Sequence, residues 1–248
     1  MNNWIIKESN NYRFHYHKNS EVYQIIDEII HNQEICFKHI CKVLNINFDT
    51  KINYYLCNSP EEVGNLYGDN EPCNAFARKP NEIFAMVNKD IKCIGYHEDT
   101  HIISYSISIP PQVFIREGLA MYFDKYHLGF NNLNWVAYFI DKNKYISISQ
   151  LILDDEFYKY NWAITYPIAG AFTEYLITMY GIEKYKEFYK KLSNDFEHWF
   201  YKIYGISISE FENDFIEYIN SFKSNKKVFK LLEDLIYYYC SLKQCQKE

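Results

Sequence analysis

Two histidines and a glutamate stand together in a pattern that can hold and use a metal ion. His97 and His101 are four residues apart, and Glu98 follows the first of them. On a helix, positions four residues apart lie on the same face, one turn from each other. Two neutral imidazoles placed in this way can bind one zinc ion, and a carboxylate beside them can reach a metal-bound water. The motif predicts a zinc hydrolase with His97 and His101 as ligands and Glu98 as general base.

A catalytic zinc site needs a third protein ligand, and Glu117 is the candidate. It lies 16 positions after His101, beyond a proline pair at 110–111 that ends the first helix. This separation leaves room for a turn and for a second helix laid across the first. The alternative interpretation of Glu117 is an ordinary acid near a helix N-terminus, stabilised by the helix dipole. A metzincin site is excluded, because it needs glycine at 104 and histidine at 107, where the chain has Ser104 and Ile107.

Other possible ligands are weaker candidates. His127 lies ten residues beyond the glutamate and is its rival as third ligand. Cys93 lies four residues before the motif, and we interpret it as a small buried residue beneath the site. His15 and His17 share one face of an expected strand, which we interpret as a solvated face, because a strand pair needs further ligands nearby.

The elements that must position these residues are strands before the motif and helices after it. We expect strands at 12–17, 51–57 and 82–87, and irregular chain at 67–81. We expect helices at 21–44 behind Ser20, from Pro60 behind Ser59, and at 90–106 behind Asp90 as a cap. After the motif, we expect helices at 114–123, 147–151, 166–179, 182–192, 207–219 and 228–242.

Composition limits the classes of partner. The 248-residue chain carries a net charge of −6 and no basic stripe, which argues against nucleic acid binding. No stretch approaches 18 apolar residues, so no membrane-spanning helix is expected. The seven cysteines are odd in number and form no CxxC pair, as in a protein with reduced thiols. Residues 1–8 lack the apolar run of a signal peptide, so we expect a cytoplasmic location.

Four stretches together resemble the gluzincin superfamily of metallopeptidases, the thermolysin-related "peptidase MA-like" proteins. They are 97–101, 115–123, 166–181 and 205–212, and their order and spacing agree over about 10–220. The resemblance implies an α+β, two-lobed zincin-like fold with one zinc ion per chain in the cleft. A mixed-sheet lobe, 1–109, would end in the metal-binding helix, and a mostly helical lobe, 110–248, would carry the third ligand. The strand at 82–87 would then be either a cleft edge that an extended peptide joins or an internal strand.

The chain departs from the family pattern in two places. The middle pair of the motif is Asp99-Thr100, where the family commonly has apolar residues, and Met121 stands where an acid often supports a histidine. Asp124 or a backbone carbonyl can take over that support.

The resemblance also suggests Tyr166 as the group that stabilises the oxyanion of the tetrahedral intermediate. Tyr105 and Tyr122 are lesser options. The expected reaction is hydrolysis of a peptide or protein substrate, in which Glu98 moves the proton. Two rivals stay open: a catalytically weak or inactive protein of this fold that binds or regulates, and a zinc hydrolase of a non-peptide substrate. The sequence does not indicate an oligomeric state.

Overall fold

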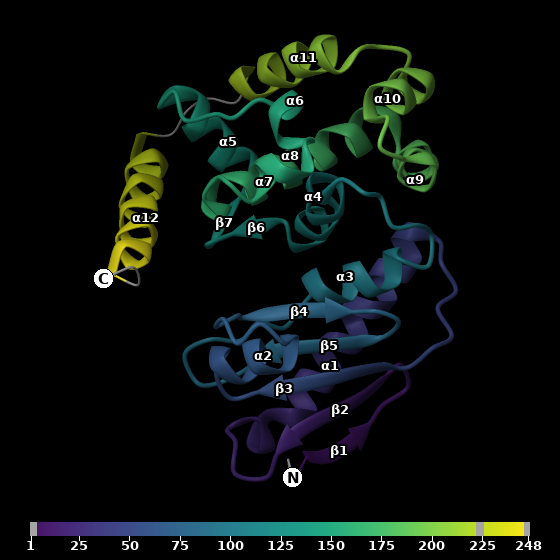
Figure 1. Ribbon diagram of the computed structural model, residues 1–248, viewed down its shortest axis with the longest axis vertical. Helices are drawn as coiled ribbons and strands as arrows, with labels where there is room; N and C mark the ends of the chain where they lie inside the picture. The colour runs from purple at the N-terminus through teal and green to yellow at the C-terminus, as the bar shows by residue number, and fades with distance from the viewer. Residues whose placement is uncertain (1–3, 222–225, 246–248) are drawn as a thin grey trace. The chain divides into compact units, whose positions relative to one another are not determined.

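The structure is a computed structural model that describes residues 4–221 and 226–245. The chain divides into two compact units, Met1–Ile107 and Ser108–Glu248. The first unit contains a five-stranded mixed sheet, and the second is mostly helical (Figure 1). The expected α+β class, with its main sheet before the motif and helices after it, is therefore confirmed. No helix within the described ranges is long and apolar enough to cross a membrane.

The sheet of the first unit has the strand order β1-β2-β3-β5-β4. The three inner strands are parallel, and β1 and β4 run antiparallel at the two edges. The bounds are Trp4–Glu8 (β1), Tyr12–His17 (β2), Ile52–Cys57 (β3), Ala75–Arg78 (β4) and Glu82–Met86 (β5). The three expected strands are thus present. Of the two interpretations of 82–87, the internal strand is correct, because β5 pairs with β3 on one side and β4 on the other.

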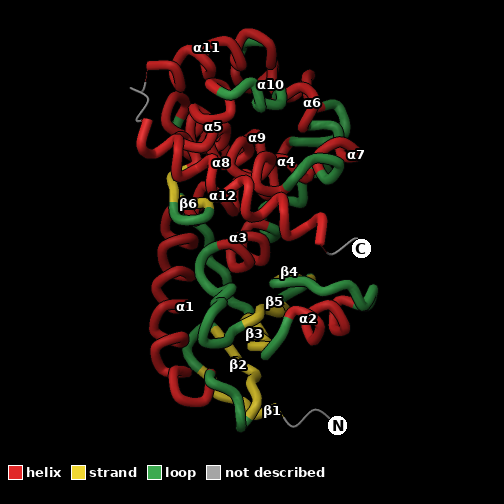
Figure 2. The backbone as a smooth tube through the Cα atoms, turned by 90° about the vertical axis from the view of Figure 1, so that its left-hand side faces the viewer, coloured by secondary structure: helices red, strands yellow, loops and turns green. Residues whose placement is uncertain are grey.

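Helices α1 (Val22–Leu44) and α2 (Pro60–Tyr67) cover opposite faces of this sheet (Figure 2). The apolar stripe of α1 packs on β2, where the ring of Tyr12 meets that of Phe37 at 5.8 Å. Ser59 caps α2 as expected, but the prediction that Ser20 caps α1 is wrong. The buried side chains of α1 recur at helical spacing: Val22, Ile26, Ile29, Gln33, Cys36, Phe37, Ile40 and Leu44.

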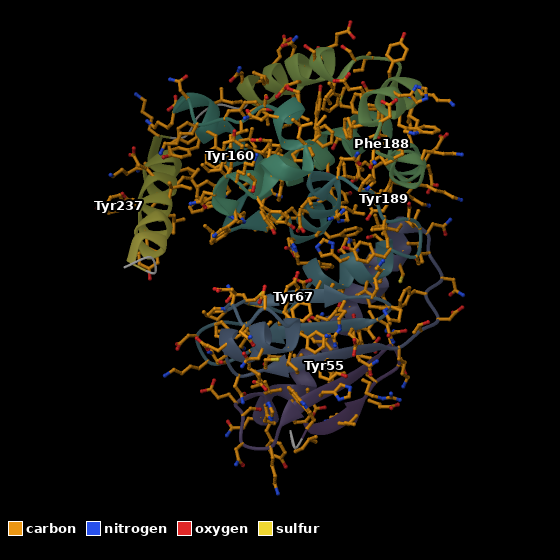
Figure 3. All side chains as sticks on the ribbon, in the orientation of Figure 1. Tyr55, Tyr67, Tyr160, Phe188, Tyr189 and Tyr237 are labelled. Carbon is orange, nitrogen blue, oxygen red and sulfur yellow. The ribbon has the colours of Figure 1, made fainter. Side chains whose placement is uncertain are left out.

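The other side of the sheet, which we call the α2 face, carries a row of stacked rings from four strands and α2. Tyr55 stacks on His15 at 4.3 Å and on Phe84 at 4.5 Å, and Phe84 stacks on Phe76 at 4.6 Å. Tyr67 of α2 meets the ring of Phe76 edge-on. Tyr55 and Tyr67 are labelled in Figure 3. The solvated strand face expected around His15 is therefore wrong: His15 is buried because the ring row covers it.

The second unit is built around α8 (Trp162–Tyr180), which packs against α4, α5 and α9. The remaining elements are α4 (Val113–Asp124), β6 (Tyr126–His127), β7 (Phe130–Asn131), α5 (Asn132–Asp141), α6 (Ile148–Leu151), α7 (Asp154–Phe157), α9 (Ile182–Lys191), α10 (Phe196–Tyr204), α11 (Ile208–Ser221) and α12 (Lys226–Cys245). The expected helices all have counterparts, and α5, α7 and α10 are additional ones. Because Asn161 caps α8, this helix begins four residues earlier than predicted.

Candidate metal centre

The two histidines of the motif lie on a short helix, α3 (His97–Ser104). Their rings are one turn apart, with centroids separated by 5.1 Å and planes at 79°. His101 is buried and His97 is half-buried. The imidazoles therefore occupy one face of the helix, as the spacing of four residues predicts.

Helix α3 starts later than the sequence suggested. Residues 88–92 form a tight turn instead, in which the Asn88 side chain accepts hydrogen bonds from the backbone of Asp90 and Ile91 at 2.9 and 2.8 Å. Gly95 then adopts a φ of 134°, which is incompatible with helix and favours glycine. The prediction of Asp90 as helix cap is wrong. Cys93 consequently lies before α3 and does not share a helical stripe with His97.

Asp99 fixes the first turn of α3 to the sheet and to α1. Its side chain is fully buried and accepts hydrogen bonds from the Tyr12 hydroxyl and, at 2.9 Å, from Gln33 Nε2. The same amide nitrogen donates to the carbonyl of Gly95 at 3.0 Å. Asp99 is thus an anchor: its hydrogen bonds to β2 and α1 hold the helix that carries the two histidines.

Burial also governs the charge on this anchor. It raises the pKa of Asp99 well above its usual range, and the hydrogen bonds from Tyr12 and Gln33 only partly oppose this. The nearby Glu98 carboxylate adds to the increase. A protonated Asp99 keeps its acceptor oxygen for both donors.

Glu117 lies in the first half of α4, where it is 8% exposed. Two contacts hold the start of this helix. Gln112 donates from Nε2 to the carbonyl of Ser193 at 2.7 Å. Arg116 donates to the carbonyls of Pro110 and Pro111 at 2.6 and 2.7 Å. The proline pair and the helix that follows it are thereby joined into one rigid segment.

Small residues let α4 approach α8 closely. A Cβ on Gly118 would stand 2.5 Å from the Thr173 hydroxyl and 2.8 Å from the carbonyl oxygen of Ala169. A Cβ on Gly170 would stand 2.7 Å from the Cβ of Met121. Met121 is therefore a packing residue against α8, which accounts for the apolar side chain where the family pattern has an acid. Its backbone carbonyl accepts a hydrogen bond from a buried asparagine, Asn132, at 3.0 Å.

The three predicted ligands form one group. Each of His97, His101 and Glu117 offers a ligand atom, and these atoms all lie within 4.8 Å of one another. Two imidazoles and one carboxylate are a donor set that suits zinc and leaves a coordination position open. It is the one such group of three or more His, Cys, Asp or Glu side chains in the part of the chain that the structure describes.

The rival ligands do not belong to this group. His127 is buried in β6, where its ring packs against Trp135 and Trp162. His15 lies in the ring row, and His17 makes a 2.7 Å contact with a carboxylate oxygen of Glu62. Ring packing within their own units accounts for the positions of His127 and His15, and the contact with Glu62 accounts for that of His17.

The tyrosines proposed for the oxyanion have different surroundings. Tyr166 lies in the second turn of α8, against Phe157 at 5.6 Å, and not at the start of the helix as expected. Tyr122 lies under the ammonium of Lys125 at 3.6 Å. Tyr105 ends α3 with its ring 5.8 Å from that of His101. The ring contact between Tyr105 and the candidate ligand His101 was not predicted from the sequence.

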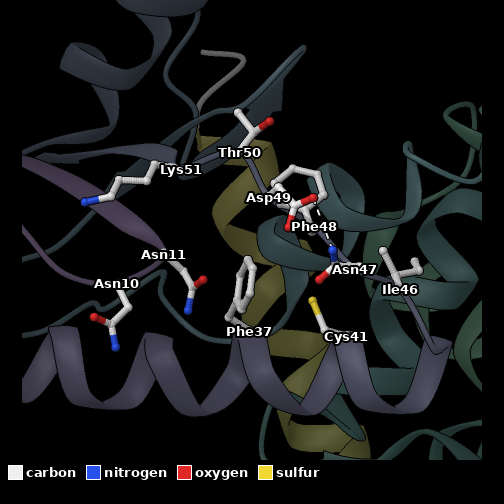
Figure 4. A pocket seen from close by; sticks show the side chains of 10 residues that line it. All are labelled: Asn10, Asn11, Phe37, Cys41, Ile46, Asn47, Phe48, Asp49, Thr50 and Lys51. Carbon is white, nitrogen blue, oxygen red and sulfur yellow. Dashed lines mark hydrogen bonds between the residues drawn. The ribbon is translucent and has the colours of Figure 1, made fainter.

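A separate pocket of about 290 Å³ lies beside the C-terminal half of α1 (Figure 4). It is lined by polar loop residues over an apolar floor that includes Phe37 and Phe48. Its polar groups are largely paired: Lys51 bonds Glu8, and Asn47 bonds Asp49. None of the three predicted ligands lines it, so it has no direct part in the candidate metal centre.

No protein-family model matches the chain, and no curated protein matches it.

Proposed function

We propose that this protein is a zinc-dependent metallopeptidase of the gluzincin type, with a two-lobed zincin-like fold. The observation that carries the proposal is the grouping of His97, His101 and Glu117 ligand atoms within 4.8 Å. A glutamate next to the first histidine is the second requirement of such a site, and Glu98 meets it. Half-burial of His97 and burial of the other two ligands favour a site with limited water access.

A zinc ion held by these residues would act as a Lewis acid and make water a nucleophile at neutral pH. Glu98 accepts the proton of the attacking water and delivers it to the leaving amine. The two histidines act as neutral ligands. Tyr166 and Tyr105 are the candidates to donate a hydrogen bond to the oxyanion. Asp99 acts indirectly, by fixing the turn that carries His97 and Glu98.

Metal content is the first test. The purified protein should contain about one zinc ion per chain, and substitution of any ligand, for example His101→Ala or Glu117→Gln, should lower it. His198→Ala and Glu197→Gln are matched controls, because both side chains are exposed on α10, and should leave zinc content unchanged. A wild-type protein that contains no zinc and binds none when it is added would overturn the proposal.

Hydrolysis is the second test. Wild type and Glu98→Gln are compared on a peptide library, with zinc content measured on both. We expect the variant to keep zinc and to lose activity by a factor on the order of 10²–10⁴, the usual contribution of a general base. Equal loss in Glu62→Gln, an acid distant in sequence from the motif, would argue against a specific role for Glu98.

The two rival functions give other results. A zinc hydrolase of a non-peptide substrate would bind zinc and leave the library intact, while cleaving ester or other small substrates in a manner that depends on Glu98. For a binding or regulatory protein of this fold, wild type and Glu98→Gln would not differ in hydrolysis of any of these substrates. The peptide reading is favoured because the resemblance extends beyond the motif to the segments around Glu117 and Tyr166.

A further inference from the structure

Two thiols of the first unit share one hydrophobic cluster on the α2 face. Cys73 and Cys93 both pack against a cluster that includes Phe84 and Met86, and both are half-buried free thiols. Cys73 comes just before β4, and Cys93 comes just before α3. They are 20 positions apart in sequence, so their shared cluster is a tertiary arrangement.

The backbone around Met86 brings the two segments together. The Met86 amide donates to the carbonyl of Asn74 at 2.8 Å, and the Met86 carbonyl accepts from the amide of Cys93 at 2.9 Å. In a strand, the N–H and C=O of one residue point to the same side. Asn74 and Cys93 therefore lie next to each other on the β4 side of β5, and Cys73 is the neighbour of Asn74.

Side-chain direction agrees with this arrangement. Cys93 is opposite Met86 in a hairpin-like pairing next to the Val87–Lys92 bridge, so its side chain points to the same face as Met86. The amide of Cys73 donates to the carbonyl of Pro60 in α2, and its side chain packs against the cluster that contains Met86. The two sulfurs thus approach the cluster from adjacent backbone positions.

We propose that Cys73 and Cys93 are a redox modification site, a thiol pair that a low-molecular-weight disulfide oxidises to an intramolecular disulfide. One cysteine thiolate attacks a sulfur of the reagent, forms a mixed disulfide and releases one reagent thiolate. The second cysteine thiolate attacks the protein sulfur of that mixed disulfide and releases the other reagent thiolate. The protein loses two hydrogens as two protons and two electrons, and the reagent becomes two thiols. The proposal does not rest on zinc binding or peptide hydrolysis.

The bond would tie the segment before α3 to the edge of the sheet. Only three residues separate Cys93 from His97, and they include Gly95. Burial raises the pKa of Cys93 to about 11, and the charges of Glu98 and Cys73 add to the increase. The fraction of Cys93 that is thiolate at neutral pH is therefore small, so its oxidation is slow. Slow oxidation favours a thiol whose partner, here Cys73, is already close to it.

The other described cysteines are internal controls. Cys36 and Cys41 are five residues apart on α1, which separates them by about 7.5 Å along the helix, too far for a disulfide. Cys57 belongs to the same cluster but is fully buried in β3. The separation of Cys36 from Cys41 and the burial of Cys57 therefore disfavour a cross-link at these cysteines.

The test is peptide mapping of the native full-length protein after incubation with oxidised glutathione. We expect a Cys73–Cys93 cross-link at roughly tenfold or more the level of any other pair, because among the described cysteines these two have the most suitable placement. Dithiothreitol should reverse it. Cys73→Ser should abolish the cross-link and leave Cys93 as a stable mixed disulfide, and Cys93→Ser should do the converse at Cys73. Cys57→Ser should leave the cross-link unchanged.

Two results would overturn the proposal. One is a map in which Cys73 and Cys93 both carry glutathione and never join. The other is a map in which they join no more often than other pairs. Because the readout is a cross-linked peptide, a protein without zinc or peptidase activity can still support this inference, and an active zinc peptidase can still contradict it.

Discussion

At the scale of single residues, Asp99 explains most about how the motif is held. An acid inside a zinc-binding motif suggests at first a further ligand or a charge near the metal. The structure gives it another partner set, the hydroxyl of Tyr12 and the amide of Gln33, in a fully buried position. Gln33 itself lies in the buried stripe of α1, where a polar residue is otherwise unfavourable. The hydroxyl of Tyr12 and the amide of Gln33 both donate to the same oxygen of Asp99, and these two hydrogen bonds fix the turn that carries the histidines.

The raised pKa of Asp99 predicts a pH dependence of stability. The unfolded chain ionises this carboxyl near pH 4, while the folded protein retains the proton to higher pH. The unfolded state therefore binds fewer protons, and the free energy of unfolding falls as pH rises above about 4, by at most about 1.4 kcal/mol per pH unit from this group. In Asp99→Asn, which keeps an acceptor oxygen but cannot ionise, this contribution disappears.

Urea unfolding of wild type and Asp99→Asn between pH 4 and 8, with a chelator present, measures the difference. We expect the variant to gain stability relative to wild type as pH rises. Asp99→Ala, which removes the acceptor and leaves a void, should cost about 2 kcal/mol. Asp49→Asn, an exposed acid, is the matched control and should show no such trend. A stability difference between Asp99→Asn and wild type that does not change with pH would mean that Asp99 is ionised in the folded protein.

At the scale of elements, the sequence predicted those with strong periodicity and missed those defined by tertiary pairing. The 23 residues of α1 and the alternating strand β2 carry clear patterns. β4 has only four residues and exists because it pairs with β5. The start of α3 depends on the turn at Asn88 and on the backbone conformation of Gly95, which periodicity does not report. The three candidate ligands were predicted from residue type and spacing. The anchor at Asp99 was not predicted, because its partners are 87 and 66 positions away.

The close packing of α4 on α8 predicts a cost for any side chain at position 118. In Gly118→Ala, the new Cβ would overlap the Thr173 hydroxyl and the carbonyl of Ala169, and a backbone carbonyl cannot rotate away. Overpacking of this kind costs about 3 kcal/mol, against about 1 kcal/mol gained in helix propensity, so we expect a net loss of about 2 kcal/mol. Chemical denaturation measures this loss in the free energy of unfolding. Lys190→Ala, on the exposed face of α9, is the control and should stay within about 0.5 kcal/mol of wild type. A variant as stable as wild type would show that the two helices are not in close contact.

At the scale of the whole molecule, a ligand that binds only the folded protein must stabilise it. If zinc binds to His97, His101 and Glu117, free zinc at 100 times its dissociation constant should add about 2.7 kcal/mol to the free energy of unfolding. For a chain of this size, that corresponds to a rise in Tm of about 5–10 °C. This stabilisation does not depend on the substrate or on any rate, so its measurement tests the metal centre apart from the peptidase proposal.

Calorimetry in a zinc-buffered solution measures this shift, and scans with chelator give the metal-free reference. His101→Ala and Glu117→Gln should lose most of the shift, while His198→Ala should keep it, since that ring is exposed on α10. Because the chain has two compact units, the scan can contain more than one transition, and each must be compared with its own reference. The same small shift in wild type and in both ligand variants would mean that zinc acts at other side chains, and that the grouping of these three residues does not bind it.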